Sequence, residues 1–194
     1  MSIMIRALIL LGAFALTACT TSPTQSTLPI ADDAAVRQLD SGAIRGFINA
    51  AGGHSWLGIP YAAPPVGERR WRAPLAPEGW TQQRDALRAG SPCIQYGSPL
   101  GGVGTAGTRQ GAEDCLYLNV YSPRLDATAA RDARLPVMVW IHGGGNTIGH
   151  AAFWDGSVLA QRENALVVMI NYRLGPFGWF KPPTQDGDMA EDRS

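Results

Sequence analysis

The tetrad His142-Gly143-Gly144-Gly145 is the part of the sequence with the clearest capacity for chemistry. Three consecutive glycines cost backbone entropy, and they lack the Cβ atoms that would keep a ligand away from the main chain. Such a loop can point two backbone N–H groups at the oxyanion that forms when a nucleophile attacks an ester carbonyl. We therefore predict oxyanion-binding donors here, with a plain glycine-rich turn as the alternative interpretation.

A nucleophile to accompany this loop is not found in the sequence. Hydrolases with an HGGG-type loop place a serine on a sharp turn between a strand and a helix, written G-x-S-x-G, and that pattern does not occur here. The nearest string is GHSWLG at 53–58, whose second glycine is one place too far. It precedes the glycine tetrad and lies in an expected hairpin, so we assign Ser55 a structural role.

The elements that must position the tetrad follow from two apolar runs. Residues 137–141 (VMVWI) lead directly into it, and residues 166–170 (LVVMI) form the second run. Continuous apolar runs are typical of strands buried on both faces of a parallel sheet. Residues 157–163 suit a short helix between them, with Asp155 or Ser157 as its N-cap. This order predicts a right-handed parallel unit and hence an α/β sheet.

Shorter elements are expected upstream. Residues 43–47 and 55–59 are predicted to form a hairpin around the Gly52-Gly53 turn, and residues 116–121 alternate as a strand does. The proline-rich stretch 60–77 is expected to run as an extended surface segment.

Composition and charge exclude several functions. The 194 residues include 16 basic and 16 acidic ones, and 45% are hydrophobic, which is typical of a globular chain with a core. Zero net charge and the lack of a basic block argue against nucleic-acid binding. The histidines and cysteines show no metal-ligand spacing, so neither a metal nor a cofactor is expected.

The N-terminus is predicted to be an export signal with a lipid anchor. Its apolar stretch, residues 7–16, is too short to span a bilayer but suits a signal peptide. The following LTAC, ending at Cys19, resembles the bacterial lipobox; an ordinary cleaved signal is the alternative. We predict a lipoprotein signal peptide over 1–18 and a flexible tether over 19–35. Acyl chains on Cys19 would hold the exported protein on the membrane of the bacterial cell envelope, at the outer-membrane or periplasmic face.

Export also bears on Cys93 and Cys115. An oxidising compartment favours a disulfide between them, and a bridge closing about twenty residues stabilises by about 3 kcal/mol in the chain-entropy model. A free, buried pair of cysteines is the alternative.

Several ordered blocks carry a resemblance to a known family. They are GIPYA, PPVG and RW within 58–71, EDCLYLNV at 113–120, HGGG at 142–145 and NYRLG at 171–175. Together they resemble the type B carboxylesterase (cholinesterase-like) family of α/β-hydrolases over about residues 42–180. The resemblance implies the N-terminal part of an α/β-hydrolase fold within 36–194: a β-hairpin and the start of the central mixed sheet, incomplete. It also implies a serine esterase that acts through an acyl-enzyme on a small-molecule ester.

The resemblance assigns roles to the tetrad. Gly144 and Gly145 would supply the oxyanion-hole N–H groups. Gly143 and His142 would support the loop, and His142 would not be the catalytic base.

The resemblance also assigns structural pairs outside the tetrad. Cys93 and Cys115 match the first disulfide of the family. Arg70 and Glu113 match a buried structural ion pair.

Two departures from the family pattern concern the substrate. Asn146 follows the glycines where an aromatic residue is usual, and Tyr96 is the only aromatic residue between the two cysteines. An aromatic cage for a quaternary ammonium is therefore not supported, and a neutral ester is the better prediction.

In the family, the nucleophile, acid and base follow the NYRLG block, so the resemblance implies that the chain ends at Ser194 before reaching them. We expect it to carry only the oxyanion-hole part and to be inactive alone, as a piece of a longer sequence or the product of an early stop or frameshift. Strand 166–170 would then be an apolar edge, and Arg173 would lack its usual aspartate partner. A non-catalytic binding or adhesion protein and a truncated product without function are the alternatives.

Overall fold

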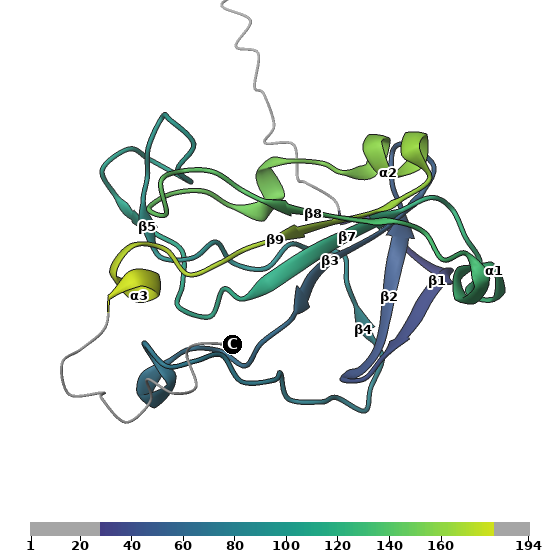
Figure 1. Cartoon of the computed structure of the whole chain (residues 1–194), viewed down its shortest axis with the longest axis horizontal. Coiled ribbons are helices and arrows are strands. Elements are labelled where there is room, and N and C mark those ends of the chain that lie inside the picture. The colour runs from purple at the N-terminus through teal and green to yellow at the C-terminus, as the bar shows by residue number, and fades with distance from the viewer. Residues whose placement is uncertain (1–27, 181–194) are drawn as a thin grey trace, which may run out of the picture.

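The computed structural model describes residues 28–180, which contain one mixed sheet, a small second sheet and short helices (Figure 1). In these residues the main sheet has seven strands in the order β1-β2-β3-β7-β9-β8, with β4 beside β2, and β5 pairs with β6 separately. The strands are β1 (Ala31–Leu39), β2 (Gly42–Ile48), β3 (His54–Pro60), β4 (Arg84–Asp85), β5 (Gln95–Tyr96), β6 (Arg109–Gln110), β7 (Tyr117–Ser122), β8 (Val137–Ile141) and β9 (Leu166–Ile170). The helices are α1 (Ala127–Asp132), α2 (Ser157–Glu163) and α3 (Gly175–Trp179), with 3-10 turns η1 (Gly67–Arg69) and η2 (Ala151–Phe153).

The upstream hairpin is confirmed. β2 and β3 pair antiparallel, and β7 pairs antiparallel with β3. Within the predicted extended stretch 60–77, the turn η1 is the one regular element after the end of β3 at Pro60.

The predicted flexible tether is wrong over its last five residues, because β1 begins at Ala31 and pairs with β2. Ala35 is fully buried, and its carbonyl oxygen accepts a hydrogen bond from Trp56 Nε1 at 2.7 Å. The pairing register shifts between Ala31 and Val36. This irregularity breaks the apolar alternation that would have revealed the strand. The predicted signal peptide and Cys19 lie outside the described residues.

The predicted parallel unit is present. β8 and β9 pair in parallel from Val137↔Leu166 to Ile141↔Ile170, with α2 between them in the chain. The N-cap position of α2 is Gly156, while Asp155 Oδ1 accepts a hydrogen bond from the Ser157 N–H at 2.8 Å.

Two expectations about this unit are wrong: that the strand at 166–170 forms the edge of the sheet, and that the strand at 137–141 is buried on both faces. β9 is not the edge of the sheet, because it lies between β7 and β8. β8 is the edge, and it is exposed along its whole length, with Val139 57% and Ile141 64% exposed. An apolar run indicates that a strand can be covered on both faces, but the order of strands depends on long-range pairing that the run does not encode.

Two buried clusters pack against β7 and β9 and the chain around them. One lies against α2 and comprises Tyr121, Ala151, Ala160, Val167 and Met169. The other surrounds the Cys93–Cys115 disulfide, whose Cα atoms are 4.9 Å apart, and comprises these cysteines with Ala62, Leu116 and Leu174. The predicted disulfide is therefore confirmed. Within residues 28–180, no helix is long and apolar enough to span a membrane.

Candidate active site

The glycine tetrad begins directly after Ile141, at the carboxyl end of β8. Gly144 has φ 124° and Gly145 has φ 60°, conformations that side-chain-bearing residues rarely adopt. A Cβ at Gly144 would collide with the carbonyl oxygen of Ile148. The turn is closed by hydrogen bonds from the N–H groups of Thr147 and Ile148 to the Gly144 carbonyl oxygen, at 3.1 and 3.2 Å.

The N–H groups of Gly144 and Gly145 donate to no described residue. Gly144 is half-buried and Gly145 is exposed, so both donors can reach a ligand. Two adjacent amide N–H groups at a strand end can bind an oxyanion.

His142 fixes the start of this loop from a buried position, with 3% of the residue exposed. Its ring stacks on Tyr172 with centroids 4.4 Å apart and lies nearly parallel to Trp154 at 6.3 Å. Tyr172 Oη donates a hydrogen bond of 2.6 Å to the His142 carbonyl oxygen. Burial raises the pKa of Tyr172, which keeps this hydroxyl protonated as the donor. His142 thus has the environment of a packed aromatic residue.

Gln95, which sequence reasoning missed, ties the disulfide loop to the chain after the tetrad. Its Nε2 donates to the carbonyl oxygens of Cys93 at 3.1 Å and Gly149 at 2.8 Å, and its Oε1 accepts from the Gly149 N–H at 2.9 Å. The residue is 4% exposed. Nothing in the sequence distinguishes this glutamine from a surface one.

Asn171 makes the corresponding connections from the end of β9. Its Oδ1 accepts from the Ala151 N–H at 2.8 Å, and its Nδ2 donates to the Ser91 carbonyl oxygen at 3.0 Å. Its own carbonyl oxygen accepts from Tyr61 Oη at 2.6 Å. The NYRLG block contained Asn171 and Tyr172, but sequence reasoning gave neither of them a task.

Asn146 occupies the place where an aromatic residue was expected. Its φ of 59° is left-handed, a region that asparagine tolerates better than most residues with a side chain. Its carbonyl oxygen accepts from the Gly175 N–H at 2.7 Å, which links the loop to the start of α3. Its backbone conformation therefore accounts for asparagine at this position.

A cavity of about 420 Å³ adjoins the tetrad. It lies between the tip of the disulfide loop and the chain before α2, and none of its described lining residues is ionisable. They are Ser98, Pro99, Leu100, Gly101, Gly102, Gly143, Gly144, Phe153 and Trp154. Tyr96 is not among them and is 68% exposed.

The expected ion pair between Arg70 and Glu113 is present but not buried. Two contacts of 2.6 Å join the guanidinium and the carboxylate, and the side chains are 36% and 18% exposed. The hydrogen bond to Glu113 raises the pKa of Arg70. Because solvent screens a half-exposed pair, its contribution is smaller than that expected for a buried one.

Arg173 was expected to lack its usual aspartate partner. Its Nη1 donates instead to a backbone group, the Arg72 carbonyl oxygen, at 2.9 Å.

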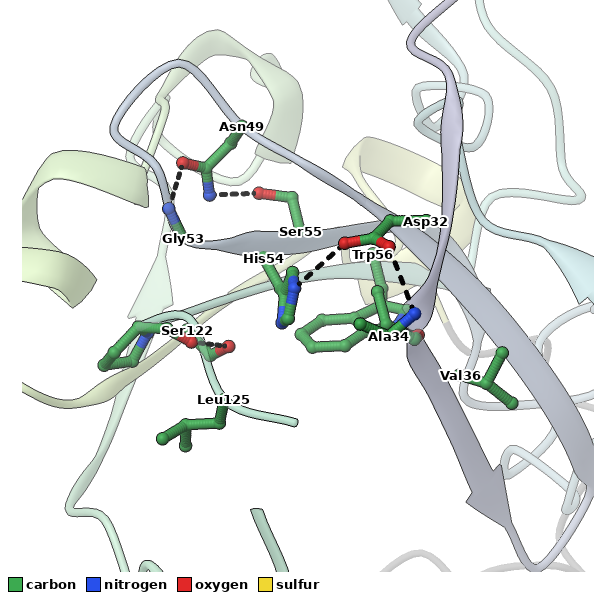
Figure 2. A network of polar contacts seen from close by, with 12 residues as sticks. Asp32, Ala34, Val36, Asn49, Gly53, His54, Ser55, Trp56, Ser122 and Leu125 are labelled. Carbon is green, nitrogen blue, oxygen red and sulfur yellow. Dashed lines mark hydrogen bonds and ion pairs between the residues drawn. The ribbon is translucent and has the colours of Figure 1, made fainter. Parts of the chain in front are cut away.

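Ser55 lies at the other end of the sheet, beside a histidine and an aspartate that do not activate it (Figure 2). Its Oγ accepts from Asn49 Nδ2 at 2.9 Å, whereas His54 Nε2 lies 3.3 Å from Asp32 Oδ2. Neighbouring residues of a strand point to opposite faces, so Ser55 and His54 cannot share a proton. Ser55 is fully buried, as its expected structural role requires. Among residues 28–180, no three metal-binding side chains lie together.

Comparisons with known proteins agree with this arrangement. The model of the Carboxylesterase family matches residues 33–190. Para-nitrobenzyl esterase of Bacillus subtilis is 48% identical over 130 residues, 66% of this chain and 25% of that protein. Mouse acylcarnitine hydrolase is 42% identical over 161 residues, 77% of this chain and 28% of that protein. A solved structure of pNB esterase superposes with a TM-score of 0.69 at 41% identity, covering 80% of this chain and 31% of that one.

These similarities settle the fold. The mixed sheet of this chain corresponds to the N-terminal part of the α/β-hydrolase fold in that esterase. The chain spans about 28% of the length of mouse acylcarnitine hydrolase. Since the family model covers most of the sequence, the chain belongs to the carboxylesterase family.

Proposed function

We propose that this chain is the oxyanion-binding part of a carboxylic-ester hydrolase. The observation that carries the proposal is the pair of unengaged N–H groups, of Gly144 and Gly145, at the carboxyl end of β8. An adhesion protein would have no use for such a pair.

In the proposed reaction, a serine attacks the ester carbonyl and the carbonyl oxygen gains the negative charge. The two N–H groups stabilise that charge without reorganising, because the turn bonds at Gly144 and the packing around His142 hold the loop in place. The intermediate then collapses, the alcohol leaves with a proton and the acyl group stays on the serine until water removes it.

The described residues do not supply the attacking serine. Ser98 lines the cavity, but its Oγ accepts a hydrogen bond from the Leu100 N–H at 3.2 Å, and no described histidine is bonded to it. The serine, its acid and its base therefore belong to another part of the whole hydrolase, and this chain alone is inactive.

The proposed substrate is a small neutral ester. The cavity beside Gly143 and Gly144 is lined by Leu100, Phe153 and Trp154 and by no described ionisable group. Such walls suit an uncharged acyl or alcohol group, and no described carboxylate lines the cavity to balance a cation. The relatives named para-nitrobenzyl esterase and acylcarnitine hydrolase support an ester-cleaving activity.

The test is a chimera in which the matched segment of this chain replaces its counterpart in the Bacillus subtilis esterase. We expect it to hydrolyse p-nitrophenyl butyrate, whereas the 194-residue chain alone stays at the blank rate. Gly79→Ala in the chimera is the control and should keep its activity, because a Cβ there meets nothing closer than 3.4 Å and Gly79 does not line the cavity beside the tetrad. A folded but inactive chimera would refute the proposal, and so would turnover by the chain alone that Ser55→Ala removes.

Export and anchoring through Cys19 are part of the same proposal. The LTAC string and the short apolar stretch before it support them. We expect radiolabelled palmitate to be incorporated in bacterial cells and Cys19→Ala to abolish the labelling. An unlabelled wild-type chain would contradict the anchor.

A further inference from the structure

A buried glutamine, Gln95, holds the residue that closes the glycine loop. Its Oε1 accepts a hydrogen bond from the Gly149 N–H at 2.9 Å, and its Nε2 donates to the Gly149 carbonyl oxygen at 2.8 Å. Gly149 is buried, and neither of its backbone groups makes another hydrogen bond to a described residue. One side-chain amide therefore satisfies both polar groups of Gly149, as a residue of a neighbouring strand would. Because Gln95 is 4% exposed, this contact lies inside the described part of the chain and needs no open surface.

Gly149 in turn lies directly against the start of the tetrad. A Cβ on Gly149 would collide with His142 Nδ1 and come within 2.8 Å of the Gly143 carbonyl oxygen. The same Nδ1 lies 2.9 Å from that carbonyl oxygen, and it donates to it in the tautomer that carries the proton on Nδ1. The position of Gly149 thus sets the position of the His142 ring and, through it, that of the Gly143 carbonyl.

The direction of the Gly143 carbonyl decides where the Gly144 N–H points. The two belong to one planar trans peptide group, in which the C=O and the N–H point in opposite directions. The next peptide group obeys the same rule, because the Gly144 carbonyl oxygen accepts the hydrogen bonds that close the turn and this orients the Gly145 N–H. The two donors are therefore oriented separately: that of Gly145 by the turn itself, and that of Gly144 by the contacts that begin at Gln95.

The stretch of chain that carries Gln95 is itself fixed in place. Gln95 Nε2 also donates to the Cys93 carbonyl oxygen at 3.1 Å, and the disulfide joins Cys93 to Cys115, two residues before β7. His150, the residue after the loop, lies with its Nε2 3.1 Å from the Gly90 carbonyl oxygen. Gln95 therefore holds the loop from a rigid base, and it does not simply follow the movements of the loop.

We propose that Gln95 is a positioning residue of the oxyanion hole: it holds Gly149 against His142 and thereby orients the Gly144 N–H toward the developing charge. Gln95 touches neither the substrate nor the reacting atoms. This role in catalysis rests on the proposed hydrolase function, whereas the coupling between Gln95 and the Gly144 amide can be measured without it.

The catalytic test replaces Gln95 by methionine in the chimera with the Bacillus subtilis esterase. Methionine is also long and unbranched, so it keeps the packing but removes both hydrogen bonds to Gly149. We expect kcat to fall about tenfold or more and KM to change less than about threefold, because a misplaced donor weakens binding of the transition state more than binding of the substrate.

A transition-state analogue separates this role from a merely structural one. A trifluoromethyl ketone forms a tetrahedral adduct with the serine, and its oxygen occupies the oxyanion hole. In Gln95→Met, its inhibition constant should rise by the same factor as kcat/KM falls. A loss of folded protein would lower the apparent kcat without changing this constant.

Gln110→Met is the matched control. Gln110 pairs with Gln95 in the sheet of β5 and β6, but its side chain donates to Thr108 Oγ1 within the disulfide loop. Gln110 does not line the cavity beside the tetrad. The same change of side chain at this position should leave both kcat and the inhibition constant as they are in the parent chimera.

Amide NMR of the full 194-residue chain provides a test that needs no activity. In Gln95→Met, the Gly144 amide resonance should shift, and that of Gly145 should shift less because the turn orients it. In Gln110→Met, both resonances should stay where they are in the wild-type chain.

Three results would each overturn the proposal: an unchanged kcat in the Gln95→Met chimera, a Gly144 resonance that does not move, and equal shifts in the two methionine variants. A folded chimera that is inactive without any further substitution refutes the hydrolase function instead, and the Gly144 resonance then still decides whether Gln95 sets the loop. Should Gln95→Met fail to fold, Gln95→Asn takes its place. Asparagine keeps the amide but is one methylene shorter, so it cannot hold both groups of Gly149, and the same changes are expected.

Discussion

The two ends of the main sheet present unengaged polar groups of different kinds. At the carboxyl end of β8, the groups are backbone N–H donors of Gly144 and Gly145, held by hydrogen bonds to the neighbouring main chain. At the other end they are side chains: Arg131 and Arg134, which make no hydrogen bond to a described residue, and the buried His54, whose ring nitrogens lack a hydrogen-bond partner among the described residues. Arg37, which lines one cavity with the other two arginines, donates to three carbonyl oxygens.

This difference explains which end sequence analysis could recognise. A backbone donor needs glycine at fixed positions, and consecutive glycines after an apolar run are visible in a sequence. Arginines that come from β1 and from around α1 become neighbours only through long-range pairing. Substitutions at the two ends test this difference.

The largest effect is expected at Gly144. In the active chimera, Gly144→Ala should lower kcat by about 10²–10³-fold, because a Cβ there collides with the Ile148 carbonyl and displaces an N–H donor. Gly143→Ala is the matched control, since its Cβ would meet open space and should cost less than tenfold. Equal losses in the two variants would contradict the assigned donors. Steady-state kinetics with p-nitrophenyl butyrate give both values.

The next effect concerns the disulfide that holds the loop beside the tetrad. Replacing Cys93 and Cys115 by serine should lower the free energy of unfolding by about 3 kcal/mol, because the unfolded chain regains the entropy of a loop. Urea unfolding followed by fluorescence measures the change. The wild-type chain in reducing buffer should match the variant, and a difference between the two would show that the serines act by another route.

A smaller effect is expected from Tyr172→Phe, which removes the hydrogen bond to the His142 carbonyl but keeps the ring stack. The free energy of unfolding should fall by about 1 kcal/mol. Tyr96→Phe provides the comparison, because Tyr96 is 68% exposed and its change should be close to zero. Similar results for both tyrosines would mean that the contact to His142 adds nothing.

The smallest expected effect is the change in folding stability with pH. Burial lowers the pKa of His54 and of His150 below 6.5; Arg37 and Arg124 lower that of His54 further, and Asp32 opposes them. Below pH 6.5 the unfolded state therefore binds more protons than the folded state, and stability falls as the pH is lowered through this window.

Urea midpoints measured from pH 7.5 to 5.5 test this dependence. His54→Phe should flatten part of the slope, because it removes one titrating group without adding another. A slope of the opposite sign would mean that the contact with Asp32 outweighs burial.

Local sequence patterns predicted where strands and helices lie better than they predicted which strands are adjacent in the sheet. The hairpin of β2 and β3, the parallel unit of β8 and β9 and helix α2 all follow from apolar periodicity and turn residues. The strand β1 was missed because its register shifts, and the edge was assigned to β9 because strand order is a long-range property.

The candidate site shows the same limit. Gly144 and Gly145 were visible because each is required by its own backbone conformation. Gln95 was invisible because its buried place depends on Gly149, which lies far along the chain. The burial of Arg70 and Glu113 was overestimated, since a resemblance indicates a pair but not its solvent exposure in this chain.

The open side of β8 has a geometric consequence for catalysis. A strand added beside it would run about 4.8 Å away, the normal spacing in a sheet. If that strand runs parallel to β8, its last residue emerges next to Ile141 and therefore within reach of the glycine amides. The free edge of β8 within the described residues thus fixes a position as well as a pairing: a strand that pairs with it in parallel also brings the residue after its end to the amides of Gly144 and Gly145.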